Sequence, residues 1–164
     1  MPFAIRSSAF RPLADIPEQY TCEGADRAPP LDWRDAPKGT MSFALIVDDP
    51  DAPDPAAPKR VWVHWVLYNL PADTHALAEG ASGTSLPDGA REGEHDGGGH
   101  GWSGPCPPIG THRYFHKIYA LDAMLPDLGA RVSKADLLRA MEGHVLAQAE
   151  LVGTYAAGRR ERRD

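Results

Sequence analysis

Residues 110–121 read GTHRYFHKIYAL, a segment whose side-chain pattern is that of a β-strand. In a strand, side chains two residues apart point to the same face. His112, Tyr114 and His116 therefore share one face, and the intervening side chains take the other. Two imidazoles and a phenol are unusual on a plain core strand, because buried polar groups need hydrogen-bond partners. The segment predicts one wall of a small polar pocket.

Two further strands are predicted upstream of this segment. Residues 41–47 (MSFALIV) form an almost unbroken apolar run, which is typical of a strand with both faces buried. Residues 61–69 (VWVHWVLYN) are aromatic and β-branched throughout, which favours a second strand. Residues 49–60 between them contain four prolines, so we expect a stiff loop without regular structure.

One helix and one more extended segment are predicted downstream. Ser133 is a favourable N-cap residue with Asp136 three residues later, and the apolar stripe that follows ends near Gly143. The sequence therefore predicts a short helix here. Residues 145–155 return to extended character, although a helical period fits 145–151 nearly as well.

The remaining segments are rich in glycine and proline. Residues 3–31 are loop-like, with one short strand predicted within 16–21, and residues 31–33 are expected to be extended after a proline pair. Residues 79–108 are long, glycine-rich and without a clear element. Such a segment inside a compact domain is often a functional loop.

Composition limits the class of protein. A chain of 164 residues suffices for one domain with a real core, so we expect a single domain over residues 1–164. The formal charge of −6 argues against a nucleic-acid surface, and the basic residues of 158–164 are expected to form a disordered solvated tail. No signal-like head and no apolar run of transmembrane length is present, which predicts a cytoplasmic protein without stable membrane insertion.

The two cysteines, Cys22 and Cys106, lack the paired spacing of a zinc site or of a redox motif. Free thiols are predicted, and the alternative is a disulfide, which requires the two residues to meet in space. Cys106 lies between prolines with no basic neighbour, so an inert thiol is favoured over a nucleophile.

Polar residues interrupt or follow each of the three predicted strands. Asp49 and Asp51 follow the first strand, His64 lies within the second, and His112 and Tyr114 lie in the third. A carboxylate near imidazoles can fix their tautomers and raise their pKa values. Neighbouring glycines can add backbone N–H donors. Together these groups predict a pocket that binds a phosphate or a carboxylate.

Each of these residues also has a simpler interpretation. Asp49 and Asp51 are more often turn-stabilising residues in a proline-rich loop, because their side chains bond to local N–H groups. His64 among aromatic neighbours is more often a hydrogen-bonded core histidine than a ligand-binding group. His116 is expected at the far end of its strand, facing water.

Catalytic and metal motifs fit poorly, and neither a metal nor a cofactor is predicted. Residues 101–105 (GWSGP) lack the second glycine of a serine-hydrolase elbow. His64 and His112 with an aspartate could hold zinc, but HExxH is absent and the tyrosine beside His112 favours hydrogen bonding. The alternative function is a hydrolase or phosphate-transfer enzyme that uses these two histidines as acid and base.

Several separated motifs together resemble a known family. Residues 49–53 (DPDAP), 62–65 (WVHW) and 104–114 (GPCPPIGTHRY) are similar to the two signature regions of the phosphatidylethanolamine-binding protein family, which includes the Raf kinase inhibitor proteins. Residues 20–26 and 29–33 resemble the short bacterial branch, so the likeness covers nearly the whole chain.

The resemblance implies a mainly β fold, an antiparallel β-sheet sandwich with few short helices, and a small anion-binding pocket. It implies a cis peptide bond at Ala52–Pro53, which is plausible because X–Pro bonds tolerate the cis form. It assigns no catalytic residue. The ligand-binding residues that it implies, first those of the pocket and then those of its mouth, are Asp49, His64, His112 and Tyr114, and Pro53, Gly104, Cys106 and Pro107.

The resemblance also implies partners. We expect a small anionic or phosphorylated ligand and no nucleic acid. A protein partner such as a kinase or a protease is a further possibility, as is a homodimer of the kind found among the short bacterial relatives.

Overall fold

The computed structural model describes residues 2–156. The predicted basic tail, residues 158–164, lies outside the described residues.

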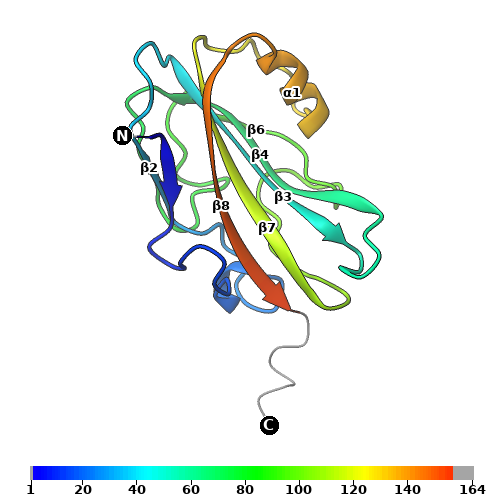
Figure 1. Ribbon diagram of the computed structural model, residues 1–164. Helices are drawn as coiled ribbons and strands as arrows, with labels where there is room; N and C mark the ends of the chain where they lie inside the picture. The colour runs from blue at the N-terminus through cyan, green and yellow to red at the C-terminus, as the bar shows by residue number, and fades with distance from the viewer. Residues whose placement is uncertain (1, 157–164) are drawn as a thin grey trace.

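Two antiparallel sheets form the structure, which confirms the predicted mainly β sandwich (Figure 1). The smaller sheet has the strand order β1–β2–β5, with β1 Ala4–Arg6, β2 Leu31–Arg34 and β5 Ala76–Leu77. The larger sheet has the order β6–β4–β3–β7–β8, with β6 Arg91–Glu92, β4 Arg60–Pro71, β3 Ser42–Ala52, β7 Thr111–Leu121 and β8 Val145–Ala156.

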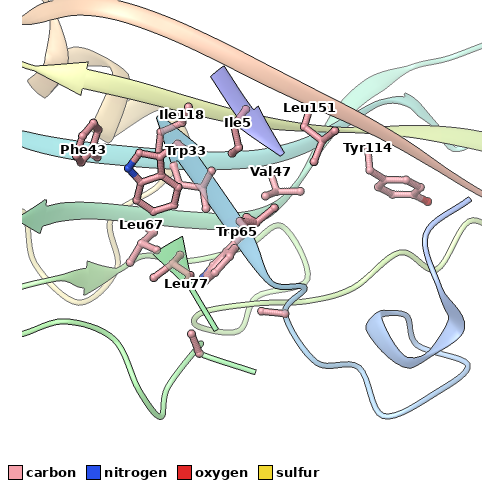
Figure 2. Packing of buried hydrophobic residues seen from close by; sticks show 14 of the residues in the cluster. Ile5, Trp33, Phe43, Val47, Trp65, Leu67, Leu77, Tyr114, Ile118 and Leu151 are labelled. Atoms are coloured by element: carbon pink, nitrogen blue, oxygen red, sulfur yellow. The ribbon is translucent and has the colours of Figure 1, made fainter. Parts of the chain in front are cut away.

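The central strand β3 is buried on both faces, as its apolar run predicts. Its inner side chains pack between the two sheets, where Phe43 meets Trp33 of β2 edge-on at 5.6 Å between ring centroids (Figure 2). Its outer side chains, Ala44 and Ile46, belong to a second apolar cluster on the opposite face of the large sheet. Both faces of β3 are therefore shielded from water, and the sheet is fixed from both sides.

The helix α1, Lys134–Met141, covers part of the outer face of the large sheet (Figure 1). Its N-terminus has the predicted capping box, in which Ser133 and Asp136 exchange side-chain and backbone hydrogen bonds. Leu137 and Met141 are its buried side chains and pack in the outer cluster. Within residues 2–156 no helix is long and apolar enough to cross a membrane.

The N-terminal prediction is wrong in one element. The strand expected within residues 16–21 is instead the short 3-10 helix η1, Glu18–Tyr20. Thr21 closes this turn, because both its backbone N–H and its hydroxyl donate to the Glu18 carbonyl. A local hydrogen bond of this kind competes with strand pairing.

The proline-rich segment 49–60 is shorter as a loop than predicted. β3 continues to Ala52 and β4 begins at Arg60, and Lys59 donates its backbone N–H to the Ala52 carbonyl at 2.8 Å. The prolines are tolerated because the pairing is irregular between Asp49 and Ala52. The predicted cis Ala52–Pro53 bond is present.

Two other segments, residues 145–155 and 79–108, can be compared with their predicted structure. The extended assignment of residues 145–155 is confirmed by β8, which pairs with β7 along its whole length. The glycine-rich segment 79–108 is not wholly irregular, because β6 lies within it and pairs with β4.

Candidate ligand-binding site

A cavity of about 310 Å³ lies where β3, β4 and β7 meet the loop that precedes β7. All the predicted ligand-binding residues line it. The lining residues are Asp49, Ala52, Pro53, Trp62, His64, Gly97, Ser103, Gly104, Cys106, Pro107, Pro108, His112 and Tyr114.

Asp49 and His112 form a buried pair at one side of this cavity. The Asp49 Oδ2 and His112 Nδ1 atoms are 2.5 Å apart. The other ring nitrogen of His112 lies 2.9 Å from the Ile109 carbonyl and 3.1 Å from the Pro53 carbonyl, so it carries a hydrogen and donates. One further proton must lie between the ring and the carboxylate, and burial raises the pKa of Asp49. Both ring nitrogens of His112 are therefore engaged within the protein.

His64 reaches the cavity through an irregularity of β4. The pairing with β3 shifts between Trp65 and Val63, which leaves His64 as the extra residue of a bulge. Trp65 packs in the inner core and Val63 in the outer cluster, while His64 lines the cavity. Bulges commonly redirect a side chain beside a functional site.

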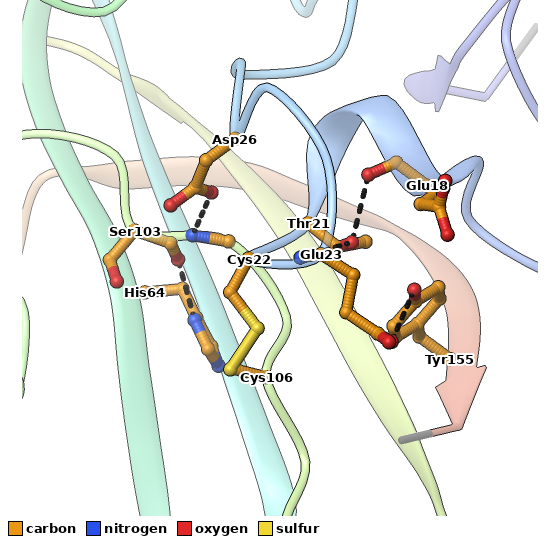
Figure 3. Close-up of a disulfide and its surroundings, with 10 residues drawn as sticks. Glu18, Thr21, Cys22, Glu23, Asp26, His64, Ser103, Cys106 and Tyr155 are labelled. Carbon is orange, nitrogen blue, oxygen red and sulfur yellow. Dashed lines mark hydrogen bonds between the residues drawn. A yellow bond between two sulfur atoms is a disulfide. The ribbon is translucent and has the colours of Figure 1, made fainter. Parts of the chain in front are cut away.

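The His64 ring has one defined hydrogen bond. Its Nδ1 lies 2.6 Å from the Ser103 carbonyl, which can only accept, so Nδ1 carries the hydrogen (Figure 3). Burial lowers the pKa of His64 to about 4, and the ring is neutral near pH 7. The expectation that a nearby carboxylate raises the imidazole pKa values is wrong for His64, because desolvation outweighs the surrounding charges.

Tyr114 lies between the two histidines and is 1% exposed. Its ring meets the His64 ring edge-on at 5.2 Å and stacks on the His112 ring at 6.4 Å. Its hydroxyl is buried and has no hydrogen-bond partner among residues 2–156. Burial, with the nearby charge of Asp49, raises the pKa of Tyr114, so the hydroxyl keeps its proton. Most buried polar groups are satisfied, and this donor is an exception.

The loop before β7 supplies the opposite wall. The Gly104 N–H donates to Oδ1 of Asp26 at 2.8 Å. A Cβ at position 104 would collide with this carboxylate and with the Tyr20 carbonyl, so only glycine fits. The backbone donor expected from this glycine is thus occupied by Asp26, a residue that carries no local sequence signal for this contact.

The prediction of free thiols is wrong, because Cys22 and Cys106 form a disulfide (Figure 3). The bond joins the loop after η1 to the cavity wall, and the Cys22 N–H also donates to the Pro105 carbonyl at 3.1 Å. The cysteines are 84 residues apart, so their proximity arises from the tertiary fold and leaves no local pattern. Cys106 lines the cavity as half of a disulfide and offers no nucleophilic thiol.

His116 does not face water, contrary to the expectation. It is fully buried, its ring lies 5.5 Å from that of Phe10, and its Nδ1 lies between the carbonyls of Tyr114 and Leu151. The chain between β1 and η1 and the strand β8 cover this part of β7. His116 does not line the cavity.

Asp51 is also held away from the cavity. Its two carboxylate oxygens accept from the Arg113 guanidinium at 2.8 and 2.9 Å, and one also accepts the Arg113 N–H. Asp51 does not line the cavity, but its partner is not the local N–H expected of a turn residue, because Arg113 is 62 residues away in the chain. Asp49 makes the local bond, since its Oδ1 accepts the Asp51 N–H at 2.7 Å. In residues 2–156 no three His, Cys, Asp or Glu side chains are grouped so that they could hold a metal ion.

Comparison with known proteins identifies the family. The sequence model of the phosphatidylethanolamine-binding protein family matches residues 6–156. The chain belongs to this family. The solved structure of a family homologue from Chlamydia trachomatis is similar, with 41% identity, a TM-score of 0.86 and coverage of 94% of this chain and 97% of that chain. A family member from Escherichia coli is 33% identical, also with a TM-score of 0.86, over 94% of this chain and 98% of that chain.

Curated family members are similar over almost their whole length. A UPF0098 protein of Methanothermobacter thermautotrophicus is 48% identical over 155 residues, which are 94% of this chain and 99% of that protein. This name describes no enzymatic activity, and neither do the names of the two family structures. Nothing in these comparisons favours the alternative of a hydrolase.

Proposed function

We propose that the cavity binds a small oxyanion, such as a phosphomonoester or the phosphate headgroup of a lipid. The observation that carries this proposal is the Tyr114 hydroxyl, a buried donor at the cavity without a protein partner. A donor left unpaired in the interior costs free energy, which an acceptor on a ligand would recover. The membership of the phosphatidylethanolamine-binding protein family supports the same ligand class.

The shape and chemistry of the walls fit a small ligand with an apolar part. Trp62, Pro53 and Pro107 line the cavity together with the disulfide, and few polar atoms lie among them. A volume of about 310 Å³ is at the lower end of ligand pockets. The walls therefore suit the organic group of a phosphomonoester, while the Tyr114 hydroxyl suits one of its phosphate oxygens.

The charge balance predicts modest affinity. None of the lining residues is a lysine or an arginine. The buried Asp49–His112 pair shares a proton and supplies no free donor. The oxyanion is held by hydrogen bonds and wall contacts without a fixed cation, so we expect a Kd in the range of ~10 µM to ~1 mM.

The decisive experiment is a titration with methyl phosphate followed by NMR of the His64 ring and of the Tyr114 backbone amide. Both signals should shift in the wild type, and Tyr114→Phe should weaken binding about tenfold because only the donor is removed. Tyr119→Phe is the matched control: it removes the same hydroxyl from a buried tyrosine of β7 that faces the outer cluster. Unchanged signals in the wild type, or equal binding by Tyr114→Phe, would refute the proposal.

Regulation of a protein partner such as a kinase or a protease, and assembly into a homodimer, are retained as proposals from the family resemblance. Light scattering during size-exclusion chromatography tests both proposals, with the protein alone and with a candidate kinase or protease added.

The proposed cytoplasmic location has a separate test, because reducing compartments keep most thiols reduced. Alkylation in intact cells should label Cys22 and Cys106 if the protein resides there, and full protection by the disulfide would place it in an oxidising compartment.

A further inference from the structure

We infer that the cavity selects oxyanions that carry a hydroxyl proton over oxyanions of the same shape and charge that carry none. A singly protonated phosphomonoester belongs to the first class, and a sulfate monoester to the second. This inference rests on the proposed function and names the chemical form of its ligand.

The first step is the orientation of the His64 imidazole. The Nδ1 hydrogen is committed to the Ser103 carbonyl at 2.6 Å, and Nε2 has no protein partner among the described residues. A neutral imidazole with its hydrogen on Nδ1 presents a lone pair at Nε2. His64 therefore faces the cavity as an acceptor, and not as the donor that an anion would require.

The carboxylates around His64 do not change this state. Asp48 and Asp96 act to raise the pKa of the ring, but burial outweighs them, and each carboxylate is already paired with a cation. Asp48 accepts from Lys117 and Lys134, while Asp96 lies 2.9 Å from the Arg60 guanidinium.

The remaining groups around the ring do not favour its protonation. On the cavity side, Asp49 is bonded to His112, and the His95 ring acts to lower the pKa of His64. No unbalanced carboxylate is thus available to hold an imidazolium at position 64.

The second step is the shortage of donors. Tyr114 offers one hydroxyl, and its ring lies 5.2 Å from the His64 ring between centroids, with both residues lining the same cavity. The other donors expected at the site are occupied, since the Gly104 N–H bonds to Asp26 and His112 bonds to two carbonyls.

These two groups have complementary demands. A fully deprotonated oxyanion can accept from Tyr114 but places an oxygen lone pair against that of His64 Nε2. A singly protonated phosphomonoester satisfies both, because one oxygen accepts from Tyr114 and its hydroxyl donates to Nε2. Sites built around a hydrogen bond discriminate strongly against analogues that cannot form it.

Methyl phosphate and methyl sulfate test this directly, because near pH 5 both carry one negative charge and only the phosphate carries a proton. We expect calorimetry at pH 5 to show methyl phosphate binding at least about tenfold more tightly than methyl sulfate. Raising the pH to 8 deprotonates methyl phosphate, whose second pKa is near 6, and should weaken its binding by ~10- to ~100-fold. Methyl sulfate should bind equally weakly at both pH values.

Two variants separate the roles of the side chains. His64→Gln replaces a fixed acceptor by an amide that can turn to donate or accept, so the preference for methyl phosphate should fall to near unity. Tyr114→Phe should weaken the binding of both ligands but retain the preference for methyl phosphate over methyl sulfate. Thermal unfolding of each variant confirms that it is folded.

Equal binding of the two ligands at pH 5 would overturn the inference and leave the proposed function intact. An equal increase in the affinity for both ligands as the pH falls would also overturn it, because His64 would then be the group that takes up the proton. Absence of binding by either ligand at either pH would refute the proposed function, and this inference with it.

Discussion

Asp48 and Asp49 are neighbours in β3 and both are buried, yet they belong to opposite faces of the large sheet and to different kinds of region. Asp48 accepts from Lys117 of β7 at 3.1 Å and from Lys134, the first residue of α1, at 2.7 Å. Asp49 accepts from His112 beside the cavity. One carboxylate joins secondary-structure elements, and the other forms part of a pocket wall.

The comparison shows that burial of a charge does not by itself mark a site. On the outer face, Asp48 has two cationic partners, so its region is complete without a ligand. On the inner face, Asp49 is also satisfied, but the adjacent Tyr114 hydroxyl and His64 Nε2 have no protein partner in residues 2–156. Unsatisfied atoms next to a cavity distinguish the binding region from the structural one.

The largest expected effect comes from breaking the covalent link on the cavity side. The Cys22–Cys106 bond closes a loop with a sequence separation of 84, and such a cross-link stabilises a fold by about 4.5 kcal/mol in the chain-entropy treatment. The double variant Cys22→Ser, Cys106→Ser should lose about this much free energy of unfolding in urea. Dithiothreitol should reproduce the loss in the wild type and leave the double variant unchanged. A double variant as stable as the oxidised wild type would contradict the assignment.

Sequence patterns found the large sheet and α1 because these elements depend on local and periodic signals. The apolar run of residues 41–47 requires two buried faces, and Ser133 with Asp136 specifies a helix start. The residues on three strands could be grouped because each strand carries an isolated polar position. The family resemblance added the cis peptide and the role of the loop before β7.

The features that sequence missed are those set by distant partners. Nothing near Cys22 indicates Cys106, and nothing near Asp26 indicates that its carboxylate holds the Gly104 N–H. His116 was expected at the surface because its covering, β8 and the segment that contains Phe10, is remote in the chain. The polarity of His64, an acceptor and not a donor, depends on the Ser103 carbonyl and could be known only from the structure.

The second prediction compares a histidine of the cavity with one of the core. Burial lowers the pKa of both His64 and His116 to about 4, from an ordinary value of 6.5. The unfolded chain then binds protons more readily than the folded one, so each contribution to stability is present above pH 6.5 and is lost as the pH falls toward 4. Each loss amounts to up to about 3 kcal/mol.

Urea unfolding at pH 7 and pH 4.5 measures this effect. His116→Gln should lose about 2 kcal/mol less stability than the wild type between these pH values, because the contribution of His116 is removed. Asp49 acts in the opposite direction, since its pKa is raised, but it is common to both proteins and cancels in the comparison. The same pH dependence in variant and wild type would show that His116 is not buried as a neutral ring.

The third prediction separates the neighbouring aspartates directly. Asp48→Asn leaves Lys117 and Lys134 without a counter-charge, and their partial exposure limits the expected loss to about 2 kcal/mol of unfolding free energy. Its affinity for methyl phosphate should stay unchanged. Asp49→Asn should cost less stability, because a buried carboxylate is replaced by a neutral group, but should reduce binding by releasing His112 and the wall that it supports. Calorimetry and urea unfolding on both variants check this, and the reverse pattern would invalidate the division into two regions.

The central claim is that an oxyanion completes the hydrogen bonding of Tyr114 and His64, and a crystal structure grown with saturating methyl phosphate near pH 5 tests it most directly. We predict one phosphate oxygen within about 3 Å of the Tyr114 hydroxyl and a second within about 3 Å of His64 Nε2, with the Nδ1 bond to Ser103 kept. A cavity that stays free of phosphate under these conditions, or a phosphate bound away from both groups, would contradict the account.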